Sequence, residues 1–206
     1  MAVVSSAKYQ MSFTTGGLFL HESLLAVDLY LLHRDWKKVR DLLLSGNLIQ
    51  ARTISSAQRV TREICQRLSL LTLEQLQLLF SGTTQERQGL LWVAVCKRYS
   101  FIKDFMTEIV RENFLRLNMV LHPSDYDMFF HDKEEWHDEL ARLSQTTKAK
   151  LRQVLHKIMH EAEILTKDDT IIPAILTARL AQVLVADNPD WLRVFAVSDS
   201  DLNEWL

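Results

Sequence analysis

The chain has 206 residues, of which 48% are hydrophobic, and this is enough to fill the core of one large domain or two small ones. It contains only five Gly and three Pro, so it lacks the residues that an all-β protein uses at its many tight turns. The composition therefore excludes a disordered tail and favours long helices. The formal net charge of -2 does not by itself indicate a polyanion partner, so the distribution of charge is the informative quantity.

Positive charge is concentrated in two segments of the chain. Residues 33–67 hold eight Lys or Arg against three acids, and residues 142–160 hold five Lys or Arg against none. Each segment therefore carries a net charge of +5, and the rest of the chain carries -12, with a dense acidic stretch at residues 125–139. The near-neutral total conceals two cationic regions on an otherwise acidic protein.

The sequence shows no feature of a secreted or membrane protein. The N-terminal MAVVSSAKYQMSF lacks a basic n-region and a continuous apolar h-region, and the best apolar runs, residues 24–32 and 89–96, are shorter than the roughly 20 residues of a membrane-spanning helix. Cys65 and Cys96 each lie in an apolar helical pattern, which is typical of buried, reduced thiols. We therefore expect a cytoplasmic protein that has no disulfide and no membrane contact. As part of the leading hypothesis, we also expect a monomer.

The first half of the chain has helical periodicity after an N-terminal arm of about 20 residues that is either docked or loose. Ser45-Gly46-Asn47 is a helix-ending signal, because Gly and Asn tolerate the left-handed conformation of a C-cap. The expected helices span residues 22–32 and 36–44, then about 57–68 with Ser55 or Ser56 as N-cap, about 74–81, a segment capped by Thr84, and about 101–117.

The second half begins with an acidic region after Pro123. Its apolar residues are expected to form a second core cluster, and they are Tyr126, Phe129, Phe130, Trp136 and Leu140. The expected helices span about 133–143, 148–162, 173–186 and 191–195, with a very short β-hairpin at 164–172. We predict an all-α, compact multi-helix protein with two helical domains, residues 1–120 and 121–206.

Each basic segment places two helices around a turn, which is the plan of a helix-turn-helix unit. The two units span about 22–68 and 133–163. Lys and Arg attract phosphate, and Arg or Gln on a protruding helix can reach base edges, so the second helix of each unit is predicted to contact double-stranded DNA. The predicted DNA-binding residues are Lys37, Lys38, Arg52, Arg59, Arg62, Gln66, Lys148, Lys150, Arg152, Gln153 and Lys157. From the pattern alone, a solvated surface is the more frequent explanation of such helix faces.

Patterns that would indicate an enzyme are incomplete. His156 and His160 have the i, i+4 spacing of two metal ligands on one helix face, but the general-base Glu of HExxH is missing. The chain has no P-loop, no GxGxxG and no GxSxG motif. The carboxylates of residues 125–139 are typical of a solvated face or of a patch for a basic partner. We expect no catalytic residue, no functional metal site and no cofactor.

Several strings together cover most of the chain, and they are DW (35–36), NLIQARTISSAQRVTREICQRL (47–68), LLWVAVCKRYSF (90–101), DF (104–105), DYD (125–127) and LSQTTKAKLRQVLHKIMHEAEIL (143–165). These strings resemble the BrxA family, small core proteins of BREX bacteriophage-exclusion systems. The resemblance implies an all-helical, non-enzymatic, DNA-binding accessory protein of phage resistance. One position departs from the family's pattern, because Glu163 stands where we expect Gly.

Three functions follow from this reading. The leading hypothesis is a double-stranded DNA-binding subunit of a phage-defence system, held mainly by phosphate contacts. The second is a protein-interaction adaptor, in which the acidic region or the cationic faces dock other BREX proteins. The third, binding of structured RNA, is disfavoured because the sequence has no RNP or GXXG motif.

Overall fold

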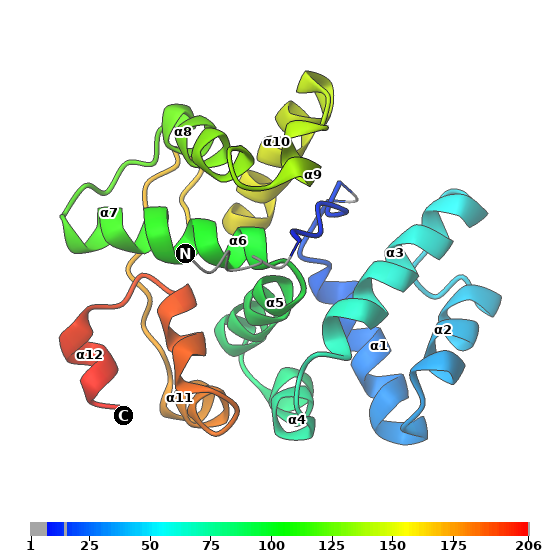
Figure 1. Cartoon of the computed structure of the whole chain (residues 1–206). Coiled ribbons are helices and arrows are strands. Elements are labelled where there is room, and N and C mark those ends of the chain that lie inside the picture. The colour runs from blue at the N-terminus through cyan, green and yellow to red at the C-terminus, as the bar shows by residue number, and fades with distance from the viewer. Residues whose placement is uncertain (1–7, 15, 206) are drawn as a thin grey trace, which may run out of the picture.

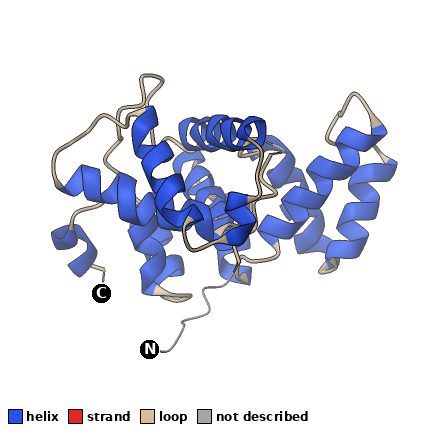
Figure 2. Ribbon diagram, turned by 45° about the horizontal axis from the view of Figure 1, so that its top comes forward, coloured by secondary structure: helices blue, strands red, loops and turns tan. Residues whose placement is uncertain are grey.

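The computed structural model describes residues 8–14 and 16–205. In this part of the chain the fold is all-α, as the composition predicts, and Figure 2 shows helices joined by loops. None of these helices has the length and apolar character needed to cross a bilayer. The α-helices are α1 (Leu20–His33), α2 (Trp36–Ser45), α3 (Ile54–Leu68), α4 (Leu73–Ser81), α5 (Thr84–Arg98), α6 (Ser100–Phe105), α7 (Arg111–Leu115), α8 (Pro123–Glu134), α9 (Asp138–Ala141), α10 (Gln145–Glu161), α11 (Ala178–Val185) and α12 (Asp199–Asn203). A π-helical segment (Met106–Val110) joins α6 to α7, and a 3-10 helix (Pro189–Val194) follows α11.

Helix α5 lies at the centre of the molecule (Figure 1). Residues 90–96 of this helix are all buried, so it is apolar around its whole circumference. A helix of this kind must be covered on every side, and α5 contacts α1, α3, α4, α6, α10 and α11. The resulting core cluster includes residues from Tyr9, in the N-terminal arm, to Leu202, in α12.

The described part of the N-terminal arm is docked on this core. Tyr9 and Phe13 are buried, and the Tyr9 hydroxyl donates a hydrogen bond to Asp104 at 2.7 Å. The Tyr9 N–H donates to the Glu139 carboxylate, also at 2.7 Å, so the arm connects α6 to α9. Residues 1–7, which carry part of the expectation about targeting, lie outside the described residues.

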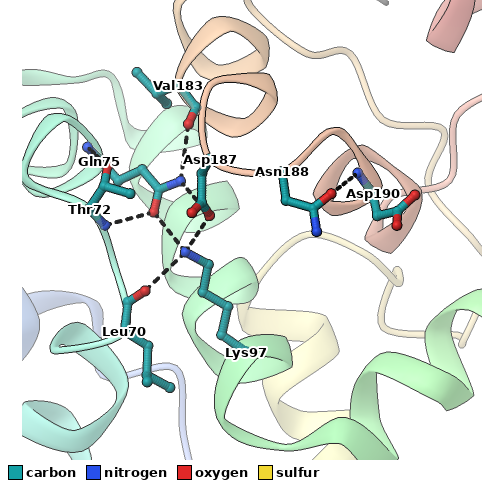
Figure 3. A network of polar contacts seen from close by, with 8 residues as sticks. All are labelled: Leu70, Thr72, Gln75, Lys97, Val183, Asp187, Asn188 and Asp190. Atoms are coloured by element: carbon teal, nitrogen blue, oxygen red, sulfur yellow. Dashed lines mark hydrogen bonds and ion pairs between the residues drawn. The ribbon is translucent and has the colours of Figure 1, made fainter.

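A polar network connects the C-terminal helices to the first half of the chain (Figure 3). The Lys97 ammonium, on α5, forms an ion pair with Asp187 at 2.6 Å and donates to the side-chain oxygen of Gln75, on α4, at 3.1 Å. Gln75 in turn donates to the carbonyl of Val183, on α11, at 3.1 Å. Contacts therefore cross residue 120, and the division into two domains at that residue stays a prediction.

Several predicted helix starts are displaced. Helix α3 is capped by Thr53, whose hydroxyl accepts from the Ser56 N–H, and not by Ser55 or Ser56. Thr83, not Thr84, caps α5 in a capping box with Glu86. The helix predicted from residue 173 begins only at Ala178, after the Thr177 N-cap. In each case, a Thr in extended conformation offers its hydroxyl to the third N–H of the helix.

The acidic region forms two helices rather than one at 133–143. Pro123 begins α8, which ends at Glu134, and the single turn of α9 follows. Tyr126, Phe129, Phe130 and Leu140 are buried, as predicted. The prediction that Trp136 belongs to the core is wrong, because the side chain lies in the connection between α8 and α9 and is 82% exposed.

Residues 164–172 turn back on themselves as predicted, but the pairing is restricted to isolated bridges. Leu165 and Ile171 form an antiparallel bridge, and the Thr166 N–H donates to the Thr170 carbonyl at 2.9 Å. A second bridge connects Thr170 to Val120. The turn starts at Glu163, whose φ of 56° lies in the left-handed region that favours glycine. This is the position at which the family pattern predicts Gly.

Candidate nucleic-acid interface

The first predicted unit folds as three helices, α1 to α3, which contact one another at one side of the molecule (Figure 1). Arg34, with a φ of 55°, ends α1, and Asp35 caps α2 by accepting the N–H groups of residues 37 and 38. The rings of Tyr30 and Trp36 stack at 4.1 Å across this corner. Residues 46–53 connect α2 to α3 and are a longer connection than the 3–4-residue turn of a helix-turn-helix.

Helix α3 has one buried and one exposed face. Ala57, Ile64 and Leu68 are buried, whereas Arg59 and Arg62 are exposed. This arrangement follows from the 3.6-residue period of the sequence, which places apolar residues three or four positions apart.

Six cations on α2, on α3 and in the connection between them are exposed. Within the described part of the chain, none of the six forms an ion pair. We call this set the α2–α3 cationic surface, and it consists of Lys37, Lys38, Arg40, Arg52, Arg59 and Arg62. A shallow groove between the two helices is lined by Lys37, Arg40 and Arg62, together with Gln66. The surface thus presents uncompensated positive charge to solvent.

Two other polar residues of α3 are already engaged by the protein. The Gln66 side-chain oxygen accepts from Arg98 at 3.1 Å, which leaves the amide nitrogen of this predicted DNA-binding residue for a partner. Arg67 is buried and donates to Glu63 at 2.6 Å and to the Gly17 carbonyl at 2.8 Å. Tyr99 donates to the same Glu63 oxygen. Arg67 therefore holds the arm against α3 and does not belong to the surface.

The second predicted unit differs from the first in the length of its connection and of its first helix. Residues 142–144 connect α9 to α10, so the connection is as short as in a helix-turn-helix, but α9 is only one turn long. Ser144 caps α10 by accepting the Thr147 N–H at 3.2 Å. The long helix of this unit packs through Leu151, Val154 and Leu155, which are buried.

The cations of α10 are compensated by acids of α8. Lys148 forms an ion pair with Glu134, and Arg152 holds Asp127 through two short contacts of 2.6 and 2.7 Å. We call these two pairs the α8–α10 clasp. The Lys148 ammonium also lies 4.9 Å from the centre of the Phe130 ring, and its hydrogen bond lowers the pKa of Glu134 below the ordinary value.

The remaining predicted residues of α10 also have partners within the chain. The Lys150 ammonium donates to the side-chain oxygen of Gln153 at 3.0 Å. Lys157 donates to the Gly16 carbonyl at 3.0 Å and lies 3.6 Å from Glu161. The two segments of equal formal charge therefore differ in the structure. Six cations of the first segment face solvent without an ion pair, whereas most cations of the second segment have partners within the chain.

Among the described residues, the chain is an all-helical protein whose α2–α3 cationic surface has no ion-pair partners. The BrxA family model matches residues 7–188, and the chain belongs to the BrxA family. BrxA proteins are components of BREX phage-defence systems.

The chain is similar to curated BrxA proteins and to a solved structure. The BREX protein BrxA of Escherichia coli O9:H4 (strain HS) is 29% identical over 147 residues, which cover 71% of this chain and 69% of that protein. The BREX protein BrxA of Bacillus cereus (strain H3081.97) is 25% identical over 134 residues, or 64% and 67% of the two chains. The crystal structure of an uncharacterized protein from Magnetospirillum magneticum has the same fold, with a TM-score of 0.79 at 20% identity over 92% of this chain and all of that one.

Proposed function

We propose that this BrxA-family chain is a non-catalytic, double-stranded DNA-binding accessory protein of a BREX system, and that it binds as a monomer. The α2–α3 cationic surface supplies the main phosphate contacts. The observation that carries the proposal is the set of six exposed cations that have no acidic partner among the described residues. A phosphate contact contributes more binding free energy when the cation has no ion pair than when an ion pair with a carboxylate must first be broken.

The shape of the unit supports a duplex as the partner. Helix α3 has 15 residues and presents Arg59 and Arg62 one turn apart on its exposed face, and a single α-helix fits the major groove of B-DNA. Lys37 and Lys38, at the start of α2, are placed to contact phosphates beside that groove. The cations of α10 have a secondary role, because their carboxylate partners must be released first.

Fluorescence anisotropy with a labelled duplex over a series of salt concentrations tests the proposal. The double variant Arg59→Glu/Arg62→Glu is expected to bind at least tenfold more weakly at low salt. It should also lower the slope of log K against log salt by about 2, since each lost phosphate contact removes about 0.9. Lys148→Glu/Arg152→Glu is expected to have a smaller effect.

The matched control is Arg116→Glu/Arg193→Glu, which changes the net charge by the same amount at exposed positions outside both units. This variant should keep most of the affinity. No binding at low salt, or equal losses in the α3 variant and the control, would refute the proposal. An excess of structured RNA, added as competitor, should displace less protein than the same mass of duplex.

An adaptor role has a separate observation in its favour. Trp136 and Met128 are 82% and 59% exposed within the acidic region, and exposed large apolar side chains next to charges are typical of protein-docking surfaces. A pull-down of other BREX proteins with Trp136→Ala tests this second function. Capture that is lost in this variant but retained in Arg59→Glu/Arg62→Glu would assign partner docking to the acidic region.

A further inference from the structure

Two histidines of α10 and one aspartate from the turn at residues 166–170 converge on one point. His156 and His160 are one helical turn apart on the same face of α10. Nδ1 of His156 lies 3.1 Å and Nε2 of His160 lies 2.8 Å from the same oxygen, Oδ1 of Asp169. The three potential ligand atoms all lie within 4.8 Å of one another.

The position of Asp169 is determined by its backbone and not only by the histidines. Its N–H donates to the Thr166 carbonyl at 3.0 Å, and its carbonyl accepts from the N–H of Leu121, a core residue, at 2.9 Å. The hydroxyl of Thr166 also accepts the N–H of Thr170 at 3.1 Å. The carboxylate is therefore presented to α10 by a turn with its own hydrogen bonds, and the three groups are preorganised.

One side of the cluster is closed and the other is open to solvent. The side chain of His156 is only 14% exposed, and its Nε2 is buried without a hydrogen-bond partner among the described residues. Without an ion, Nδ1–H of His156 donates to the Asp169 carboxylate at 3.1 Å. Because Nε2 has no competing partner, the ring proton can move to Nε2 and leave the Nδ1 lone pair for a metal. The side chains of His160 and Asp169 are about one third exposed, which leaves room for water beside them.

We propose that His156, His160 and Asp169 bind one divalent transition-metal ion, with Zn²⁺ as the representative of the class. Two imidazole nitrogens and one carboxylate oxygen are the ligand set that such ions accept, whereas Mg²⁺ and Ca²⁺ prefer oxygen ligands alone. Adjacent ligands about 2.0–2.2 Å from a tetrahedral or octahedral ion lie roughly 2.8–3.6 Å apart. The two nitrogen–oxygen separations of 2.8 and 3.1 Å agree with this range. The two nitrogens lie within 4.8 Å of each other, so binding requires at most a movement of the two rings toward each other.

The ion would change the charge of a defined stripe of α10. Lys148, Arg152, His156 and His160 follow one another at intervals of four residues, so they lie along one side of the helix. With neutral imidazoles, the three ligands carry a single negative charge, and a divalent ion makes the site positive. The proposal departs from the sequence expectation of no functional metal site, because that expectation considered the two histidines without Asp169.

The experiment uses the full chain without a polyhistidine tag, first stripped of metal with a chelator. Isothermal titration with Zn²⁺ is expected to give one ion per chain, and Co²⁺ is expected to produce visible absorption bands at the same stoichiometry. His160→Gln and Asp169→Asn should each weaken binding at least tenfold. His21→Gln, which removes an exposed histidine from α1, should bind as the wild type does.

Two results would overturn the proposal. One is a wild-type chain that binds no Zn²⁺ near 1:1, and the other is equal binding by His160→Gln, Asp169→Asn and wild type, which would mean an adventitious ion only. If both variants fail to fold by circular dichroism, the ring ¹⁵N shifts of the wild type decide. Zn²⁺ should shift Nδ1 of His156 and Nε2 of His160 among the seven histidines, and shifts at other histidines alone would refute the site.

Discussion

Glu163 has a backbone conformation that its side chain makes unfavourable. Its φ is 56°, and a residue with a Cβ atom pays roughly 1–2 kcal/mol in the left-handed region. The residue follows the end of α10 and its N–H donates to the carbonyl of His160 at 3.2 Å, which is the geometry of a helix C-terminus that usually uses Gly. The family pattern predicts Gly at this position, and Gly would adopt this conformation without the strain.

Replacement Glu163→Gly is therefore expected to stabilise the protein. Relief of the left-handed strain exceeds the added entropy of the unfolded chain, and the net gain should be about 1 kcal/mol. Ala149→Gly, at an exposed position inside α10, is the control and should destabilise by about 1 kcal/mol. Urea denaturation measures both. A loss of stability in Glu163→Gly would show that side-chain contacts of Glu163 outweigh the backbone strain.

At the scale of helices, the α8–α10 clasp distinguishes the two cationic segments. Asp127 and Glu134 neutralise two of the four α10 cations that the sequence predicts to contact DNA, Arg152 and Lys148. These acids precede their partners by 25 and 14 positions, so periodicity within α10 contains no information about them. When no competing anion is present, the clasp keeps the side chains of Lys148 and Arg152 paired with acids of α8.

Removal of the clasp acids should therefore increase DNA affinity. In Asp127→Asn/Glu134→Gln, the two cations become free for phosphate, and the salt slope should rise by up to about 0.9 for each new contact. The control Asp132→Asn/Glu135→Gln removes the same charge from exposed positions in and directly after α8. Fluorescence anisotropy should show a larger gain in DNA affinity for Asp127→Asn/Glu134→Gln than for the control. Equal gains would mean that only net charge matters and that the clasp does not compete with DNA.

The whole molecule has one continuous core that crosses the predicted domain boundary at residue 120. Helix α5 contacts both α3 and α10, and Lys97 connects α5 to Asp187 after α11. The side chain of Lys97 is 8% exposed and that of Asp187 is 24% exposed, so the ion pair is shielded mainly on the Lys97 side. Loss of one partner of a fully buried pair typically costs about 3–5 kcal/mol, and the partly exposed Asp187 makes the cost of losing Lys97 smaller.

We accordingly expect a single cooperative unfolding transition. Lys97→Met should lower the midpoint temperature of this transition but should not divide it into two transitions, because the helices on both sides of residue 120 share the core. Differential scanning calorimetry of the wild type and this variant is the measurement. Two separate transitions in the wild type would instead support the division into residues 1–120 and 121–206.

The all-α class, most helices and most core residues can be predicted from the sequence, because these depend on interactions between residues three or four positions apart. It also placed the cations of α2 and α3 on a solvent face. Three properties could not be predicted in this way: which charges remain without a partner, the exposure of Trp136, and the position of Asp169 beside two histidines. Those properties depend on groups brought together from distant positions, and the spacing of residues within one helix does not encode them.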